Sequence, residues 1–182
     1  MNKKLIIAAL LIAVIAIGSA SAFSFVDYAD GIKDSSIFIN VGVGYGFFTG
    51  LKIPPIQISV DYHLPIGIPL SVGAFFAFAA YEYSTWAWNY DGIYLAFGGR
   101  AAWHIDLGVK NLDLYAGVAL GYMLDSWTRS WPGWTDYKDS LGYFYWGGFV
   151  GVKYFFTNNI GIYGEFGYSA LTVAQIGLAI KF

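Results

Sequence analysis

Alternation of apolar residues with polar or small ones recurs along most of this chain and predicts β-strands. Residues 56–64 read IQISVDYHL, in which Gln57, Ser59, Asp61 and His63 alternate with Ile, Val, Tyr and Leu. Successive side chains of a strand point to opposite faces, so this spacing puts an apolar face opposite a polar one. A helix would scatter both sets around its circumference.

Eight segments share this alternation, and their even number predicts a closed antiparallel barrel. They are residues 37–47, 56–64, 70–81, 93–106, 112–123, 142–156, 160–169 and 173–182. Three connections are short and rich in turn residues, namely 65–69, 107–111 and 157–159. Two others, 83–91 and 125–141, read as longer loops. We therefore expect short turns at the periplasmic rim and long loops outside the cell.

Composition decides which solvent surrounds the barrel. The chain is 57% hydrophobic, 20% aromatic and only 12% charged, and a soluble domain with such a surface would aggregate. The soluble alternative is a lipocalin-like barrel with the apolar residues inside, among them Phe97, Trp103, Trp146 and Phe182. Eight such rows would overfill so narrow a lumen. The sequence therefore predicts an all-β, eight-stranded, transmembrane up-and-down β-barrel.

The first residues have the order of a secretory signal peptide. Lys3 and Lys4 precede an apolar run at 5–17, and small residues then end at Ala22. The alternative, a membrane anchor, normally needs about 20 apolar residues. We expect a signal peptide at 1–22, a periplasmic lead-in at 23–35 and the barrel at 36–182.

Charge and cysteine content limit the possible partners. Ten Lys and Arg stand against twelve Asp and Glu, and loss of Lys3 and Lys4 would leave eight against twelve, a formal net charge of −4. This acidic balance argues against a nucleic-acid partner. The chain has no cysteine, so disulfides and thiolate metal sites are excluded.

The mature chain resembles the small outer-membrane β-barrel superfamily of the OmpA-transmembrane, OmpX and OmpW type. The resemblance is carried by LKIPPIQISVDYHL, LYAGVALGY, GGFVGVKYFFTNNIGIYGEFGYS and the terminal strand, over about residues 36–182. It implies localisation in the bacterial outer membrane and contact with its lipids. It also implies that Ile176, Leu178, Ile180 and Phe182 form the signal read by the barrel-assembly machinery. These motifs identify a fold and not an activity.

Every charged residue within the eight segments falls on the parity assigned to the lumen. A buried ion needs a partner, so we expect a polar network that plugs the lumen, with Arg100 and Glu165 as one pair. The network residues are Asn40, Asp61, His63, Arg100, His104, Asp106, Asp113, Lys153, Glu165 and Lys181. The rival interpretation is a proton or ion pathway, which a barrel of eight strands is too narrow to favour.

The extracellular half of the same parity is rich in Gly and Ala. Small residues there would leave a blind apolar pocket, and the resemblance to OmpW would then imply passage of a small hydrophobic molecule. Alternatively, Phe75, Tyr94, Tyr145 and Phe149 fill the space, which the small volume inside eight strands favours.

The stretch at 125–140, DSWTRSWPGWTDYKDS, carries three tryptophans among mostly polar residues. Trp and Tyr gather at membrane interfaces, where the ring is buried and its polar atom stays hydrated, which explains Trp127 as an anchor of an aromatic girdle. Trp131 and Trp134 flank a Pro-Gly tip, too far from the strands for that role. Aromatic platforms also bind sugars and peptides, so these two residues are candidates for an extracellular ligand.

No enzymatic activity, cofactor or metal is expected. Barrel enzymes of the lipid deacylase and palmitoyltransferase kinds are implied to use a histidine near the extracellular leaflet, whereas His63 and His104 fall at periplasmic strand ends. Two histidines with Asp61 or Asp106 make only a weak metal signal. We therefore expect a structural and surface protein with a closed or nearly closed lumen, and a receptor or adhesin as the alternative.

Overall fold

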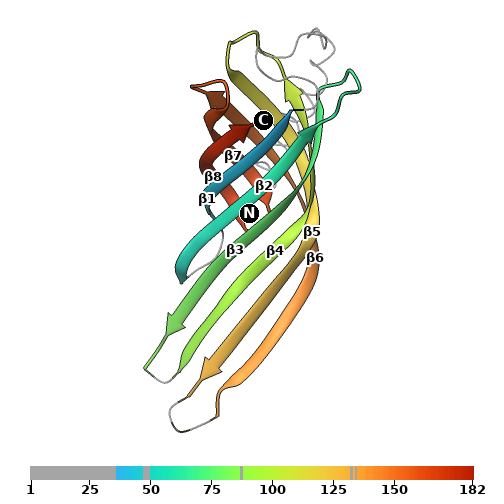
Figure 1. Cartoon of the computed structure of the whole chain (residues 1–182). Coiled ribbons are helices and arrows are strands. Elements are labelled where there is room, and N and C mark those ends of the chain that lie inside the picture. The colour runs from blue at the N-terminus through green and yellow to red at the C-terminus, as the bar shows by residue number, and fades with distance from the viewer. Residues whose placement is uncertain (1–35, 47–49, 87, 132, 134) are drawn as a thin grey trace, which may run out of the picture.

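The chain folds into one closed antiparallel β-barrel (Figure 1). The computed structural model describes residues 36–46, 50–86, 88–131, 133 and 135–182. The expected signal peptide, the lead-in and Trp134 lie outside these residues. The strands are β1 (Ile37–Tyr45), β2 (Leu51–His63), β3 (Leu70–Ser84), β4 (Asn89–Ile105), β5 (Leu112–Ser130), β6 (Tyr137–Phe155), β7 (Ile160–Ser169) and β8 (Thr172–Lys181). The predicted fold class is confirmed.

Pairing of the first strand with the last closes the barrel. β1 pairs with β8 from Phe38↔Lys181 to Tyr45↔Ala174. Two backbone hydrogen bonds extend this seam, from Ile37 N to Phe182 O at 3.1 Å and from Phe182 N to Ile37 O at 2.9 Å. Each strand therefore has a partner on both sides, which is what a sheet needs where no water can satisfy a free edge.

The two faces of the barrel follow the alternation in the sequence. On β5 and β6 the outward side chains are apolar and exposed, with Leu120 at 63% and both Phe144 and Trp146 at 83%. The charged side chains of the same strands, Asp113 and Lys153, are 2% and 1% exposed. An exposed apolar band beside buried charges is the reverse of a soluble protein and suits a barrel in lipid.

The two connections expected to be long loops are mostly strand, which corrects the sequence prediction. β3 and β4 are joined by residues 85–88, and β5 and β6 by residues 131–136. The β4–β5 register continues to Asn89↔Ser130 and the β5–β6 register to Arg129↔Tyr137. Beyond the apolar band the outward residues become polar while Tyr and Trp lie on the inner face, so the contrast that marks a strand in the barrel is lost, although Trp, Tyr and Thr still favour strands.

Four strands therefore project beyond the others as a curved wall (Figure 1). β3 to β6 have 15, 17, 19 and 19 residues, whereas β1, β7 and β8 have 9, 10 and 10. We call this wall the extension and define it as residues 81–84, 89–94, 125–130 and 137–141. The end of the barrel opposite the extension carries the β2–β3, β4–β5 and β6–β7 turns and is called the turn end.

Asp106 was predicted to face the lumen, and the structure shows that this was wrong. β4 ends at Ile105, and the Oδ1 of Asp106 accepts a hydrogen bond of 2.7 Å from the backbone N of Gly108. An aspartate side chain that accepts a hydrogen bond from the backbone N two residues later forms an Asx-turn. Gly108 adopts a positive φ of 66° within this turn. In the described part of the chain no helix is long and apolar enough to cross a membrane.

A charge placed on the apolar band tests this assignment of the faces. Val118→Arg lies in the middle of the outward row of β5, and we expect it to destabilise the barrel in lipid vesicles by about 2–4 kcal/mol. Thr128→Arg, on the same outward row but within the extension, should cost less than about 0.5 kcal/mol. Urea unfolding of the vesicle-inserted variants measures both, and equal costs would show that the band does not face lipid.

Candidate functional site

Arg100 is the centre of a buried polar network inside the barrel. It lies on β4, is 4% exposed, and its guanidinium is held by carboxylates from two other strands. Its Nη2 lies 2.5 Å from Glu165 Oε1, and its Nε lies 3.1 Å from Asp61 Oδ1. The guanidinium also stacks over the Phe149 ring at 4.3 Å from the ring centroid. One cation thereby ties β2, β4 and β7 together across the lumen.

The two carboxylates bound to Arg100 have further partners. Glu165 accepts a hydrogen bond of 2.9 Å from the Tyr115 hydroxyl and another from the side-chain amide of Gln175. Asp61 accepts one of 2.9 Å from Asn40 Nδ2. A buried carboxylate is tolerated only when its lone pairs are used in this way. The network is therefore built as a unit.

A second cluster lies toward the turn end. His104 Nδ1 is 2.7 Å from Asp113 Oδ1, and His104 Nε2 is 2.9 Å from the Ser71 hydroxyl. Since a carboxylate only accepts, Nδ1 carries the hydrogen in this pair. The ring of His63, which is fully buried, lies edge-on to His104 with centroids 5.3 Å apart. Both histidines thus act in a packed polar core.

Lys153 and Tyr115 join the two clusters. Lys153 Nζ is 3.7 Å from Asp113 Oδ2 and stacks over the rings of Phe38 and Tyr115, each at 4.4 Å from the centroid. The other end of Tyr115, its hydroxyl, reaches Glu165. The polar side chains therefore form one continuous layer across the lumen.

The structure brings together most of the residues predicted for this network. Asn40, Asp61, His63, Arg100, His104, Asp113, Lys153 and Glu165 are all buried inside the barrel. Asp106 lies in the β4–β5 turn instead. Lys181 is only half-buried, at the end of β8, with its Nζ 5.0 Å from the centroid of Phe155. Within the described residues no group of three or more His, Cys, Asp and Glu could hold a metal ion.

Beside this network a cluster of buried apolar side chains lies inside the barrel. Its buried members are Phe75, Ala77, Ala79, Ala96, Ala102, Tyr115, Ala119, Met123, Tyr145, Phe149, Ala170 and Leu171, and Tyr94 packs against them. The sequence analysis missed the contribution of the β7–β8 turn. Ala170 adopts a φ of 55°, and Leu171 is 1% exposed, so this turn is folded into the barrel. Small residues around the wall make room for it.

An aromatic row climbs the inner face of the extension. Tyr81 lies between Tyr94 and Tyr90, with centroid distances of 4.7 and 5.7 Å. Trp88 continues the row, 6.3 Å from Tyr90 and 5.6 Å from Tyr83. The β3–β4 turn fixes Trp88, whose backbone N donates to Thr85 Oγ1 at 3.2 Å and whose carbonyl accepts from Thr85 N at 2.9 Å. These rings lie on the inner parity of β3 and β4, the same parity as Ala79 and Ala96.

Two tryptophans of the 125–140 stretch lie on this same face. Trp131 follows the last residue of β5 and is 37% exposed. Trp127 shares the inner parity of Met123 and pairs in register with Gly92 and Asp139. An interface anchor has to contact lipid, so this register does not favour a girdle role for Trp127, which stays a prediction.

Arg129 lies among these rings and was not singled out from the sequence. Its guanidinium carbon is 5.5 Å from the centroid of Tyr90, 5.6 Å from that of Trp131 and 5.9 Å from that of Trp88. All three distances fall within the range of a cation–π contact. The available signal was the parity of TRSW, which puts Arg129 and Trp131 on one face of a strand.

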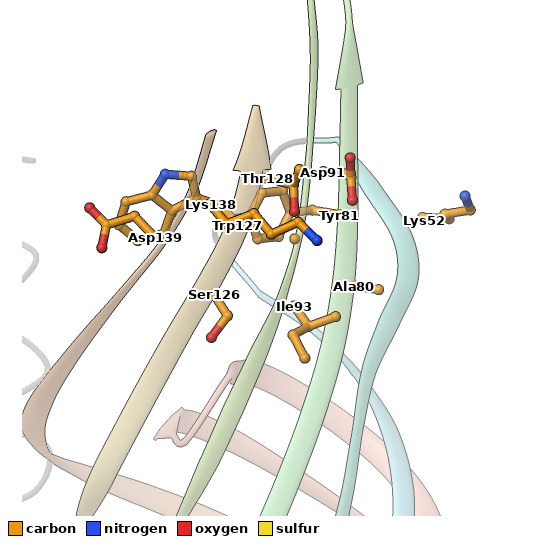
Figure 2. A pocket seen from close by; sticks show the side chains of 11 residues that line it. Lys52, Ala80, Tyr81, Asp91, Ile93, Ser126, Trp127, Thr128, Lys138 and Asp139 are labelled. Carbon is orange, nitrogen blue, oxygen red and sulfur yellow. The ribbon is translucent and has the colours of Figure 1, made fainter. Parts of the chain in front are cut away.

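The extension also carries a shallow hollow of about 440 Å³ (Figure 2). Its lining includes Lys52, Lys138, Asp91 and Asp139, two cations and two carboxylates. Lys52 also pairs with Glu82 at 2.7 Å, and the hydrogen bond and charge of Glu82 raise the pKa of Lys52. With charges of both signs in balance, we assign no ligand to this hollow.

A hydrogen bond links two of the strands at the base of the extension. The Tyr81 hydroxyl donates to Asp125 Oδ1 at 2.8 Å. Partial burial raises the pKa of Asp125, and the hydrogen bond from Tyr81 offsets only part of this rise. Asp125 therefore serves the packing of β3 against β5.

Comparison with known proteins identifies the architecture. The sequence matches no protein-family model and no curated protein. Among solved structures, a major outer membrane protein of Thermus thermophilus is similar, with a TM-score of 0.60 and 14% identity over 82% of this chain and 100% of that one. The protein has the fold of a small outer-membrane β-barrel.

Two further solved barrels agree. The N-terminal β-barrel domain of Pseudomonas aeruginosa OprF has a TM-score of 0.50 and 16% identity, covering 82% of this chain and 98% of that one. Neisserial surface protein A has a TM-score of 0.50 and 16% identity, covering 81% and 95%. At these identities the similarity establishes the fold, and the resemblance to small outer-membrane barrels is confirmed at that level.

Removal of the central cation tests the lumen network. Arg100→Met leaves Asp61 and Glu165 buried without their counter-ion, and we expect a loss of about 3–5 kcal/mol in urea unfolding from lipid vesicles. Adding Asp61→Asn and Glu165→Gln to that variant should recover most of the loss. Lys110→Met, in the exposed β4–β5 turn, is the matched control. A loss no larger than that of the control would show that the network does not hold the barrel together.

Proposed function

We propose that the protein is an integral outer-membrane β-barrel with a closed lumen and a structural and surface role. The observation that carries this proposal is the continuous filling of the barrel. A layer of ion pairs around Arg100 crosses the lumen, and Leu171 and its neighbours fill the space above it. Ions cannot pass a layer of this kind unless paired charges separate inside a low-dielectric wall.

The same filling argues against passage of a small hydrophobic molecule through the lumen. A route from the extension would have to displace Leu171, Tyr145 and Phe149, which are 1%, 7% and 3% exposed. It would then meet the charged layer, which is unfavourable for an apolar solute. The small residues that suggested a pocket instead receive the β7–β8 turn.

The proposal places the turn end in the periplasm and the extension outside the cell. The outward apolar band would contact the lipids of the outer membrane. Residues 1–22 would direct secretion before cleavage. The alternating Ile176, Leu178, Ile180 and Phe182 at the closing seam would be recognised by the barrel-assembly machinery. No enzymatic role is proposed, because both histidines of the chain, His63 and His104, are packed within the lumen network.

A second function, a receptor or adhesin, is favoured by one specific observation. The inner face of the extension bears an aromatic row, of which Tyr83 is 54% exposed and Trp131 37% exposed. Exposed aromatic rings gathered on one side of a rigid wall are typical of a binding surface. The lumen and the extension are separate parts of the molecule, so a closed barrel and a binding wall are compatible.

Single-channel recording tests the closed lumen. Wild-type protein in a planar bilayer should give no steady current, since the ion pairs around Arg100 bridge the lumen, while a porin measured alongside reports that insertion works. Uptake of a fluorescent hydrophobic solute into vesicles should also equal that of vesicles without protein. Steady currents that change with Glu165→Gln would overturn the proposal and identify the network as an ion pathway.

The receptor function is tested by screening the mature protein in nanodiscs against glycans and host-matrix proteins. We expect at least one ligand, whose signal falls by about tenfold in Trp131→Ala because a stacked ring contributes on the order of 1 kcal/mol or more. Trp103→Phe, on the outward face of β4, is the control for general effects of losing an indole. An unchanged binding profile for Trp131→Ala would remove Trp131 from the receptor hypothesis.

A further inference from the structure

Arg129 is an exposed cation surrounded by aromatic rings, and no carboxylate neutralises it within the described residues. The ion pairs found among the described residues are formed by Lys52, Arg100, His104 and Lys153. The carboxylates of the same face are engaged elsewhere, since Asp125 accepts from Tyr81 and Asp139 accepts from Tyr137 and from the backbone of Ser140. A guanidinium at the surface without a counter-ion is free to bind an anion.

The neighbouring rings restrict the position of the Arg129 guanidinium and so favour anion binding. Trp88, Tyr90 and Trp131 lie 5.5 to 5.9 Å from its guanidinium carbon. Trp88 and Tyr90 are perpendicular to one another, so the planar guanidinium can stack on the face of at most one of them, and its in-plane N–H donors are available on the sides that no ring covers. A carboxylate meets that edge with two parallel hydrogen bonds. Because the contacts with the rings already restrict the guanidinium, less side-chain entropy is lost when an anion binds.

The surroundings of Arg129 favour a ligand with rings of its own. Tyr83, Trp88 and Tyr90 are neighbours beside the guanidinium, with Trp88 tilted against Tyr83 and edge-on to Tyr90. The hydroxyl and indole groups of these rings provide hydrogen-bonding atoms at the ring edges. A pyranose ring has an apolar C–H face and a rim of hydroxyls, and it matches such a surface on both counts.

We propose that the extension binds a carboxylate-bearing saccharide, with the carboxylate on Arg129 and a neighbouring sugar ring stacked on the aromatic row. This inference rests on the receptor function above and specifies the chemical class of its ligand. Backbone pairing fixes the wall, since β4 pairs with β5 up to Asn89↔Ser130 and β5 pairs with β6 up to Arg129↔Tyr137. The site is therefore formed without a ligand. An acidic peptide is the alternative occupant that the test has to exclude.

Isothermal titration of the mature protein in nanodiscs with tetragalacturonic acid tests the proposal. Its fully methyl-esterified form keeps the rings and removes the charge, and glutarate and a tetraglutamate peptide keep the charge without the sugar. We expect binding of the acid at micromolar to millimolar concentration. The ester, glutarate and the peptide should each bind at least about tenfold more weakly, since a hydrogen-bonded charge pair and a stacked ring are each of that order.

Variants assign the binding to this site. Arg129→Gln should weaken binding of the acid by about tenfold or more, and Arg129→Lys should recover only part because an ammonium lacks the planar fork. Trp86→Ala is the matched control on the same end of the barrel, since Trp86 is 98% exposed at the β3–β4 turn and should not affect the affinity. Urea unfolding of each variant should match wild type.

Three results would overturn the inference: no binding of the acid by wild type, equal binding of the ester or the peptide, or unchanged affinity in Arg129→Gln. A failure here is distinguishable from failure of the receptor function. If the glycan and matrix screen still finds a ligand sensitive to Trp131→Ala, the receptor stands and only the class of ligand is wrong.

Discussion

Closure of the sheet is the constraint on which the rest of this structure depends. Within lipid no water is available to a free strand edge, so each backbone donor and acceptor needs a partner in a neighbouring strand. The seam between β1 and β8 supplies the last set of these bonds, and Ile37 and Phe182 complete it. Closing eight strands fixes the diameter, and that diameter leaves room inside for side chains alone.

The narrow lumen explains why its charges form a network. Arg100 and Lys153 stand against Asp61, Asp113 and Glu165, and each of these ions is at most 5% exposed. Isolated ions there would be far less stable than in water, so each is held by partners from several strands. Such a layer costs desolvation in forming, and a barrel with an apolar interior would avoid that cost.

Much of the fold could be predicted from the sequence because one physical contrast runs through it. In segments such as IQISVDYHL, lipid on one side and a polar lumen on the other force strict alternation, which reveals strands and faces together. The same contrast is enough to assign Arg100 and Glu165 to the inner face from their positions in the chain. It fails at strand ends, and Asp106 shows why: a residue one position beyond Ile105 follows turn chemistry, and parity no longer decides where it points.

The extension could not be predicted by that route because its strands continue beyond the outward apolar band. There the outer residues, such as Thr128 and Lys138, are polar, and the inner ones, such as Trp127 and Arg129, are aromatic or charged. What holds these residues in strands is the register inherited from the barrel below. The continued register also explains the position of Arg129, since a flexible loop would not fix the distance between the guanidinium and the rings. A paired strand sets their spacing in advance, so a surface rich in aromatic rings outside the lipid becomes a fixed site.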